Sequence, residues 1–240
     1  MKPKIFYTKM LEVFSNSNEN FLIDSTGKKT TYLEAKSLIS KCYTKLKNYE
    51  NKKIVILSEK SILNYCLILT ILFSGNTWVP LNPDNPFQRI RDILKTLEPD
   101  LLILDKDTKD DLLQFLDKNL IKYKFIDDLF LGLETEVTFD RLEIKPKHLS
   151  MIYFTSGSTD IPKGVMIKHE SFIQNVLNIL KIVKPKKNIF GDYHDLSFVI
   201  SIPIIFPAIM SESSIFIGNK FDNILPCNSI LNFNIDFLIT

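Results

Sequence analysis

The sequence contains few cysteines, histidines and glycines, and its two signs of charge nearly cancel. Among 240 residues there are 3 cysteines, 3 histidines and 7 glycines. Cys42, Cys66 and Cys227 show no CxxC spacing, and no histidine completes a ligand pattern with them, which excludes a disulfide scaffold and a zinc motif. We therefore expect reduced structural thiols, no metal-ligating side chains and a cytoplasmic location.

Long apolar runs are also missing. The longest, Phe198 to Met210, contains a serine and two prolines and is too short to cross a membrane, and the N-terminus has no apolar signal-peptide core. With 30 basic and 28 acidic residues the net charge is +2, which gives no case for general attraction to nucleic acid. The sequence thus predicts neither a membrane span nor a nucleic-acid partner.

What is present is the composition of a chain that can bury a large core. Hydrophobic residues make up 45% and charged residues 24%, which excludes general disorder, collagen and coiled coil. A length of 240 residues allows one large domain or two small ones.

Apolar runs alternate with helix-like segments in the first part of the chain. The pattern predicts strands at 53–57, 77–79, 101–104 and 123–126, and helices at 31–46, 62–73, 86–97 and 109–117. Thr31 and Glu34 have capping-box spacing, Gly75 is the expected left-handed C-cap of the second helix, and Asn85 is the expected N-cap of the third. Alternating strands and helices predict parallel pairing, and hence an α/β fold of layered, mostly parallel sheets with helices on both faces.

A second α/β stretch follows Lys147. Its pattern predicts strands at 150–155, at 214–217 and from 235 onward, and helices at 171–182 and 221–232. The charged stretch from Glu134 to Lys147 has little periodicity and is the best linker candidate. We therefore expect a first α/β subdomain over residues 1–145 and a second one over residues 146–240.

The segment from Tyr153 to Gly164, YFTSGSTDIPKG, is the one most suited to chemistry. A run of hydroxylated residues and glycine directly follows an apolar strand, and Lys163 stands nearby. Hydroxyls and exposed backbone N–H groups hold phosphate oxygens, and a lysine adds positive charge. The Walker A pattern does not fit here, and a polar loop without a ligand is the structural alternative. The residues predicted to bind phosphate are Thr155, Ser156, Gly157, Ser158, Thr159, Lys163 and Gly164.

This run, together with Pro162, resembles the phosphate-loop signature of the adenylate-forming (AMP-binding) enzyme superfamily. That superfamily includes acyl-CoA synthetases, adenylation domains of nonribosomal peptide synthetases, D-alanine–carrier protein ligases and luciferases. Other segments agree with it in order and spacing: they are Thr30–Ala35 for "TYxEL", Ile71–Pro83 for "LxAGxxxVPLDP", and Pro86 with Arg89 for "YPxxRI". The resemblance covers the chain from about residue 20 to its end.

The resemblance implies an ATP-dependent ligase that works in two steps. A carboxylate oxygen attacks the α-phosphorus of ATP, which forms an acyl-adenylate and releases pyrophosphate; a thiol of coenzyme A or of a carrier protein then takes the acyl group. In the family this loop holds the β- and γ-phosphates, usually with Mg²⁺. The implied catalytic role of Lys163 is to balance charge on the leaving pyrophosphate, although an ordinary solvated lysine is the alternative.

Asp160 departs from the family pattern, which usually has glycine at this position. Aspartate tolerates a left-handed backbone better than most residues, so the turn can form. A carboxylate beside a triphosphate nevertheless opposes binding. We expect weakened ATP binding that Asp160→Gly relieves.

The segment His194–Val199, HDLSFV, resembles the "FDxSV" segment of amino-acid-activating members. There the aspartate accepts a hydrogen bond from the substrate α-ammonium group, and Asp195 matches it; a buried cation needs such a carboxylate. The implied substrate is a carboxylic acid, specifically an amino acid. Two alternatives remain: fatty-acyl and aryl ligases often place a histidine in this region, where His194 stands, and Asp195 also suits a helix cap.

Other residues near these motifs have two readings each. Val199, Ile202 and Ile204 either line an apolar side-chain pocket or pack in the core. His169 stands where similar enzymes often have histidine, and we expect capping and packing there rather than catalysis.

Three family features have no match in the 240 residues: the "YGxTE" segment, the ribose-binding aspartate and the lysine of the mobile C-terminal domain. The resemblance therefore implies the N-terminal part of a ligase, incomplete at the C-terminus and inactive alone. Its expected partners are an acid substrate and a carrier protein or coenzyme A. The alternatives are an acyl-CoA synthetase fragment and a non-catalytic remnant that acts as a binding module.

Overall fold

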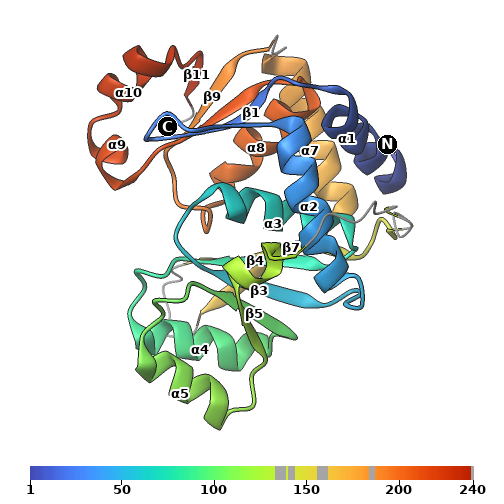
Figure 1. Cartoon of the computed structure of the whole chain (residues 1–240). Coiled ribbons are helices and arrows are strands. Elements are labelled where there is room, and N and C mark those ends of the chain that lie inside the picture. The colour runs from blue at the N-terminus through green and yellow to red at the C-terminus, as the bar shows by residue number, and fades with distance from the viewer. Residues whose placement is uncertain (133–138, 140–143, 156–161, 184–186, 239–240) are drawn as a thin grey trace.

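The computed structural model describes residues 1–132, 139, 144–155, 162–183 and 187–238. Within these ranges the chain forms two sheets with helices packed on their faces (Figure 1). The carboxyl ends of strands from both sheets meet at one cleft, and that edge positions most of the residues discussed below.

The larger sheet has six strands in the order β6-β5-β3-β4-β7-β8. All neighbours pair in parallel except β7 and β8, which form an antiparallel hairpin. The strands are β3 (Lys53–Leu57), β4 (Thr77–Leu81), β5 (Leu101–Leu104), β6 (Tyr123–Phe125), β7 (Leu149–Thr155) and β8 (Lys163–Lys168). The first four lie close to their predicted positions, whereas β8 was not predicted.

Helices cover both faces of this sheet, as the alternating pattern predicts. The helices are α2 (Tyr32–Leu46), α3 (Ile62–Phe73), α4 (Phe87–Leu97), α5 (Asp110–Lys118) and α6 (Ile126–Phe130). Figure 1 shows α4 and α5 on the opposite side of the sheet from α3. The capping box of Thr31 and Glu34 is confirmed at the start of α2, and Gly75 has the left-handed φ of 72° expected after α3. Pro86, rather than Asn85, occupies the N-cap of α4.

The smaller sheet has five strands in the order β11-β9-β10-β1-β2. They are β1 (Asn20–Asp24), β2 (Lys29–Thr31), β9 (Ile189–Asp192), β10 (Ser214–Ile217) and β11 (Phe237–Leu238). Only β2 runs antiparallel to its neighbour. The accompanying helices are α1 (Pro3–Asn16), α7 (His169–Val183), η1 (Val199–Ser201), α8 (Ile202–Met210), α9 (Lys220–Ile224) and α10 (Pro226–Phe233). The single helix predicted at 221–232 is thus two helices, because Pro226 cannot continue the first and instead begins the second.

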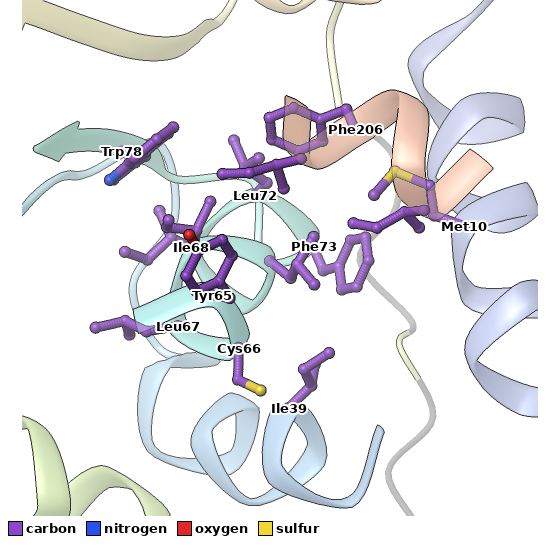
Figure 2. Packing of buried hydrophobic residues seen from close by; sticks show 14 of the residues in the cluster. Met10, Ile39, Tyr65, Cys66, Leu67, Ile68, Leu72, Phe73, Trp78 and Phe206 are labelled. Atoms are coloured by element: carbon purple, nitrogen blue, oxygen red, sulfur yellow. The ribbon is translucent and has the colours of Figure 1, made fainter. Parts of the chain in front are cut away.

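The main core lies between the two sheets and is built from helices of both chain halves. Figure 2 shows Met10 of α1, Ile39 of α2, Phe73 of α3 and Phe206 of α8 turned toward one another. Side chains of β3, β7 and β10 close the same cluster from the two sheets. Burying each such side chain contributes roughly 1.5–3 kcal/mol, so this shared layer holds the sheets together.

Neither sheet respects a division at residue 145. Strands β7 and β8 lie beyond that position but join β3 to β6, and β1 and β2 lie before it but join β9 to β11. The predicted linker also contributes to the core where the structure describes it, because Ile144 is buried and Phe139 packs against Tyr43 and Phe73. Two subdomains split at residue 145 would therefore each lose strands from both sheets.

The helices of the chain are short, and the most apolar of them are buried. Among the described residues, no helix is both long and apolar enough to cross a membrane. The most apolar helices, α3 and α8, have 12 and 9 residues and lie in the core.

Candidate functional site

The predicted phosphate loop connects the two strands of the β7–β8 hairpin. Thr155 at the end of β7 stands opposite Lys163 at the start of β8, and Phe154 stands opposite Gly164. Lys163 and Thr155 are exposed. Outside the described residues lie the remaining loop positions, namely Ser156, Gly157, Ser158, Thr159 and Asp160. The hairpin therefore brings together the three predicted residues that the structure describes, at the two ends of the loop.

Close packing explains why Gly164 lacks a side chain. A Cβ atom there would lie 3.0 Å from Cγ2 of Ile152 and 3.3 Å from Cζ of Phe154, closer than ordinary van der Waals contact. On the other side of the loop, Arg89 from α4 donates a hydrogen bond to the carbonyl oxygen of Thr155 at 3.3 Å. Both contacts fix the base of the loop against the sheet.

Asp195 lies in a turn that follows the carboxyl end of β9. Its Oδ1 accepts a hydrogen bond from the backbone N–H of Ser197 at 2.8 Å, and its carbonyl oxygen accepts one from the N–H of Phe198 at 3.0 Å. Asp195 thus caps this turn, which partly fulfils the capping alternative, although the helical segment η1 starts only at Val199. Because Oδ1 alone makes the turn hydrogen bond, Oδ2 is left outside it.

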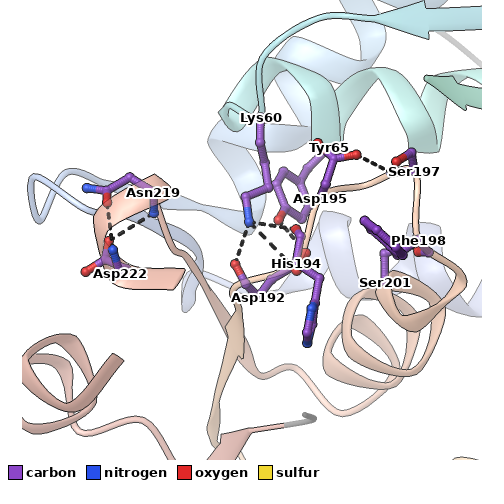
Figure 3. Close-up of polar contacts among 10 residues, drawn as sticks. All are labelled: Lys60, Tyr65, Asp192, His194, Asp195, Ser197, Phe198, Ser201, Asn219 and Asp222. Carbon is purple, nitrogen blue, oxygen red and sulfur yellow. Dashed lines mark hydrogen bonds and ion pairs between the residues drawn. The ribbon is translucent and has the colours of Figure 1, made fainter. Parts of the chain in front are cut away.

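A buried polar cluster, which the sequence did not reveal, adjoins this turn (Figure 3). Lys60 follows β3, and its Nζ donates hydrogen bonds to the carbonyl oxygens of Asp192 at 2.7 Å and His194 at 2.9 Å. The Tyr65 hydroxyl from α3 donates to Oδ2 of Asp192 at 2.6 Å. Lys60 Nζ also lies 3.9 Å from Oδ1 of Asp192, so the cluster joins the two sheets at their carboxyl edges.

Burial governs the electrostatics of this cluster. It raises the pKa of the Asp192 carboxyl and lowers the pKa of the Lys60 ammonium group, while each charge partly offsets the shift of the other. The negative charges of Asp195 and Asp222 further favour the charged form of Lys60. Burial and Asp192 raise the pKa of Tyr65, which therefore keeps its proton and donates. Since Oδ1 of Asp192 has no hydrogen-bond partner among the described residues, Lys60 supplies its nearest counter-charge.

Hydrogen bonds also connect the phosphate-loop strand to the Asp195 segment. The hydroxyls of Tyr153 on β7 and Ser201 on η1 lie 3.2 Å apart, and Ser201 Oγ donates to the carbonyl oxygen of Phe198 at 2.9 Å. The Tyr153 ring packs edge-on against Trp78 of β4, with centroids 5.7 Å apart. The loop and the turn are therefore held by one connected set of buried side chains.

A small cavity of about 10 Å³ separates the Asp195 turn from the ends of β3 and β4. Such a volume holds one water molecule at most. Lys60 and Asp195 both line it, so the ammonium and the carboxylate face the same enclosed space. The lining residues are Ile56, Ser58, Lys60, Asn64, Trp78, Pro80, Leu81, Asp195 and Leu196.

The predicted apolar pocket does not form from all three of its candidate residues. Ile202 and Ile204 are buried in the main core, whereas Val199 is 56% exposed. Val199 belongs to η1, and the chain turns into α8 directly after it, so the three side chains face different surroundings. Core packing, the second reading of the sequence, therefore holds for Ile202 and Ile204.

His169 packs in the core, as the sequence predicts. Its Nδ1 lies 2.7 Å from the hydroxyl of Tyr7, and its Nε2 has no partner among the described residues. Burial, with a smaller contribution from His148, lowers the pKa of His169 to about 3. His169 is thus neutral at ordinary pH and begins α7 rather than facing the loop.

A cleft of about 810 Å³ opens where the carboxyl ends of β1, β3, β5 and β10 meet. Its size is that of a small-molecule site, and Lys60 lies in its wall. Charged and polar groups line it, among them Asp24, Lys28, Glu59, Lys60, Asp105, Lys106, Asp107, Asp127 and Asn219. No group of three or more histidine, cysteine or acidic side chains suited to a metal ion occurs within the described ranges.

One signal could have indicated Lys60 in advance. The polar run Ser58 to Ser61 follows the apolar strand 53–57 directly, and ligand sites of parallel sheets lie at the carboxyl ends of strands. Asp192 gives no comparable signal, because strand β9 itself was not predicted.

Comparison with known proteins gives the family and the fold. A family model described as AMP-binding enzyme matches residues 13–239. Among curated relatives, a mycosubtilin synthase polypeptide of Bacillus subtilis is 25% identical over 234 residues, which cover 96% of this chain and 9% of that protein. Nonribosomal peptide synthetase nlsA of Emericella nidulans is 28% identical over 126 residues, covering 52% of this chain and 2% of that protein. The chain thus spans less than a tenth of these relatives.

Solved structures share the fold at low identity. ATP-bound MatB from Rhodopseudomonas palustris aligns with a TM-score of 0.81 at 17% identity, over 95% of this chain and 48% of that chain. VinN in complex with L-aspartate gives 0.81 at 18%, over 96% and 65%. The N-terminal subdomain of Klebsiella oxytoca NpsA in complex with 3-hydroxyanthranilyl-AMSN gives 0.76 at 21%, over 98% and 58%. The predicted α/β architecture of layered, largely parallel sheets is confirmed.

Proposed function

This chain belongs to the AMP-binding enzyme family, and from that premise we propose that it carries the phosphate loop and the acid-binding turn of an ATP-dependent ligase that activates an amino acid. The observation that carries the proposal is the pairing of two elements. The β7–β8 hairpin presents the loop from Thr155 to Lys163, and the Asp195 turn is connected to β7 through Tyr153 and Ser201.

In this proposal the hairpin residues bind and orient the phosphates. Thr155 and the loop hydroxyls and N–H groups hold the β- and γ-phosphates of ATP, with Mg²⁺ as their counter-ion. The exposed ammonium group of Lys163 neutralises charge that develops as pyrophosphate leaves. Gly164 keeps β8 close to Phe154, so the two ends of the loop stay in register.

The Asp195 carboxylate recognises the acid to be activated. Its free Oδ2 accepts a hydrogen bond from the substrate α-ammonium group, while Oδ1 keeps the turn closed. Two comparisons support an amino acid: a relative is a nonribosomal peptide synthetase, and VinN was solved with L-aspartate. By the same likeness, the thiol that receives the acyl group is that of a carrier protein, with coenzyme A as the alternative.

Binding of adenylate mimics by the 240-residue chain tests the proposal. The probes are a panel of aminoacyl sulfamoyl-adenosines, each paired with its des-amino counterpart, titrated by calorimetry. We expect at least one aminoacyl probe to bind more tightly than its partner. Asp195→Ala should weaken that probe about tenfold or more, because a hydrogen bond to a charged group is worth roughly 1.5–3 kcal/mol.

Two matched variants sharpen the result. Lys163→Ala should weaken binding of ATP with Mg²⁺, whereas Lys168→Ala, at the far end of the same exposed strand, should leave it unchanged. Asp117→Ala on α5 is the control for Asp195→Ala. Equal binding of aminoacyl and des-amino probes would favour the acyl-CoA synthetase alternative, and absence of any nucleotide binding would favour a non-catalytic module.

A further inference from the structure

We propose that Lys60 is a positioning residue that fixes the Asp195 turn and thereby sets the preference for acids that carry an α-ammonium group. The inference rests on the proposed function, since it concerns the same acid-binding turn. Lys60 comes from the larger sheet, whereas the turn comes from the smaller one. The residue therefore acts across the junction between the sheets, and it acts through the backbone rather than by touching the acid.

The contacts of the ammonium group carry the argument. Lys60 Nζ holds the carbonyl oxygens of Asp192 and His194, two residues apart and directly before Asp195 (Figure 3). One ammonium group that binds both carbonyls fixes the path of the chain between them. The Lys60 side chain is only 11% exposed, so water does not compete easily for these hydrogen bonds. The direction in which Asp195 leaves β9 is set by this clamp.

The charges of the cluster leave Asp195 available. Lys60 and Asp192 lie 3.9 Å apart, and Tyr65 holds the other Asp192 oxygen at 2.6 Å. The positive charge of Lys60 is thus balanced by Asp192, so the pair has no net charge. Asp195 faces Lys60 across a cavity with room for one water at most, and it keeps its own negative charge for a cationic group of the substrate.

The test compares paired ligands in matched variants of the full chain. The probes are the aminoacyl sulfamoyl-adenosine that binds best and its des-amino counterpart. Lys60→Met keeps the length of the side chain but removes its donors. We expect the ratio of the two affinities to fall at least tenfold in Lys60→Met and to recover partly in Lys60→Arg, whose guanidinium group can donate to the same carbonyls.

A measurement without ligand follows the turn itself. In Lys60→Met the amide protons of Ser197 and Phe198, which bond to Asp195, should exchange with solvent at least tenfold faster. Amides of β5, which does not contact the turn, should keep their rates. If Lys60→Met does not fold, Asp192→Asn decides the matter, because it frees Lys60 to pair with Asp195 and should lower the same affinity ratio.

The outcomes separate the inference from the proposed function. A wild-type chain that prefers the aminoacyl probe, with an unchanged ratio in Lys60→Met or in Asp192→Asn, overturns the role of Lys60 and leaves the proposed function standing. Equal weakening of both probes overturns it in the same way, since that is the result of a merely structural role. A wild-type chain without any preference overturns both.

Discussion

Among single residues, His169 gives the clearest dependence of stability on pH. Its pKa is lowered from 6.5 to about 3 in the folded chain, mainly by burial. The unfolded state therefore binds a proton that the folded state excludes, and stability falls as the pH drops from about 6.5 toward 3. Between pH 7 and pH 5 this residue alone should cost roughly 2 kcal/mol. Urea unfolding, followed by the fluorescence of the single tryptophan, Trp78, measures the difference.

The variant His169→Gln isolates this contribution. It keeps a neutral polar group near Tyr7 but cannot take up the proton, so its stability should change about 2 kcal/mol less over the same range. His148→Gln, a half-buried neighbour with no comparable burial, serves as the control. A variant whose pH dependence equals that of the wild type would show that His169 is protonated without penalty in the folded chain.

Residues were predictable from the sequence only where a motif carried them. Lys163, Gly164 and Asp195 were identified by their order within recognisable segments, and the structure places the first two at the base of the loop and the third in a turn. Lys60 and Asp192 were missed because their importance lies in burial and pairing. These properties arise only when β3 and β9, from different sheets, come together.

Among the elements, α10 shows how one aromatic ring attaches a helix to a sheet. The Tyr193 ring lies against two glycines at strand ends: a Cβ at Gly191 would come within 2.5 Å of the ring, and one at Gly218 within 2.7 Å. The Tyr193 hydroxyl lies 2.8 Å from Oγ of Ser229 on α10. The two glycines thus make room for a ring that reaches the helix.

Gly191→Ala should therefore detach α10 from the smaller sheet. The added methyl group forces Tyr193 to move, and overpacking of this kind costs roughly 1–3 kcal/mol. Thermal unfolding measures the loss of stability, and amide exchange in α10 should accelerate. Tyr193→Phe, which removes only the hydroxyl, should cost about 1 kcal/mol. Equal stability of Gly191→Ala and the wild type would mean that the ring has other space to occupy.

Element types were more predictable than their pairing. Strands such as 53–57 and 101–104 are short apolar runs, and the capping box at Thr31 fixed the start of α2. By contrast β8 was missed because its residues are largely exposed, and exposed strands lack the apolar pattern used to find them. The order of strands in each sheet depends on contacts between distant segments, which a local pattern does not contain.

For the whole molecule, the two sheets and the helices between them form one interdependent unit. Trp78 of β4 pairs with Met151 of β7, and Leu22 of β1 pairs with Ile215 of β10, so each sheet needs both halves of the chain. The helical layer is shared in the same way, because Met10 and Phe206 lie in one cluster. Unfolding should accordingly be a single cooperative transition.

Cutting the chain at residue 145 tests this interdependence. Residues 1–145 and 146–240, produced separately, should each fail to show a cooperative thermal transition, because each loses strand partners and exposes part of the shared core. Mixing them should restore the near-ultraviolet signal of Trp78, whose ring packs on Tyr153 from the other fragment. If residues 1–145 alone unfold cooperatively and give dispersed amide resonances, the first half is a self-sufficient subdomain and the crossed strands are secondary to its stability.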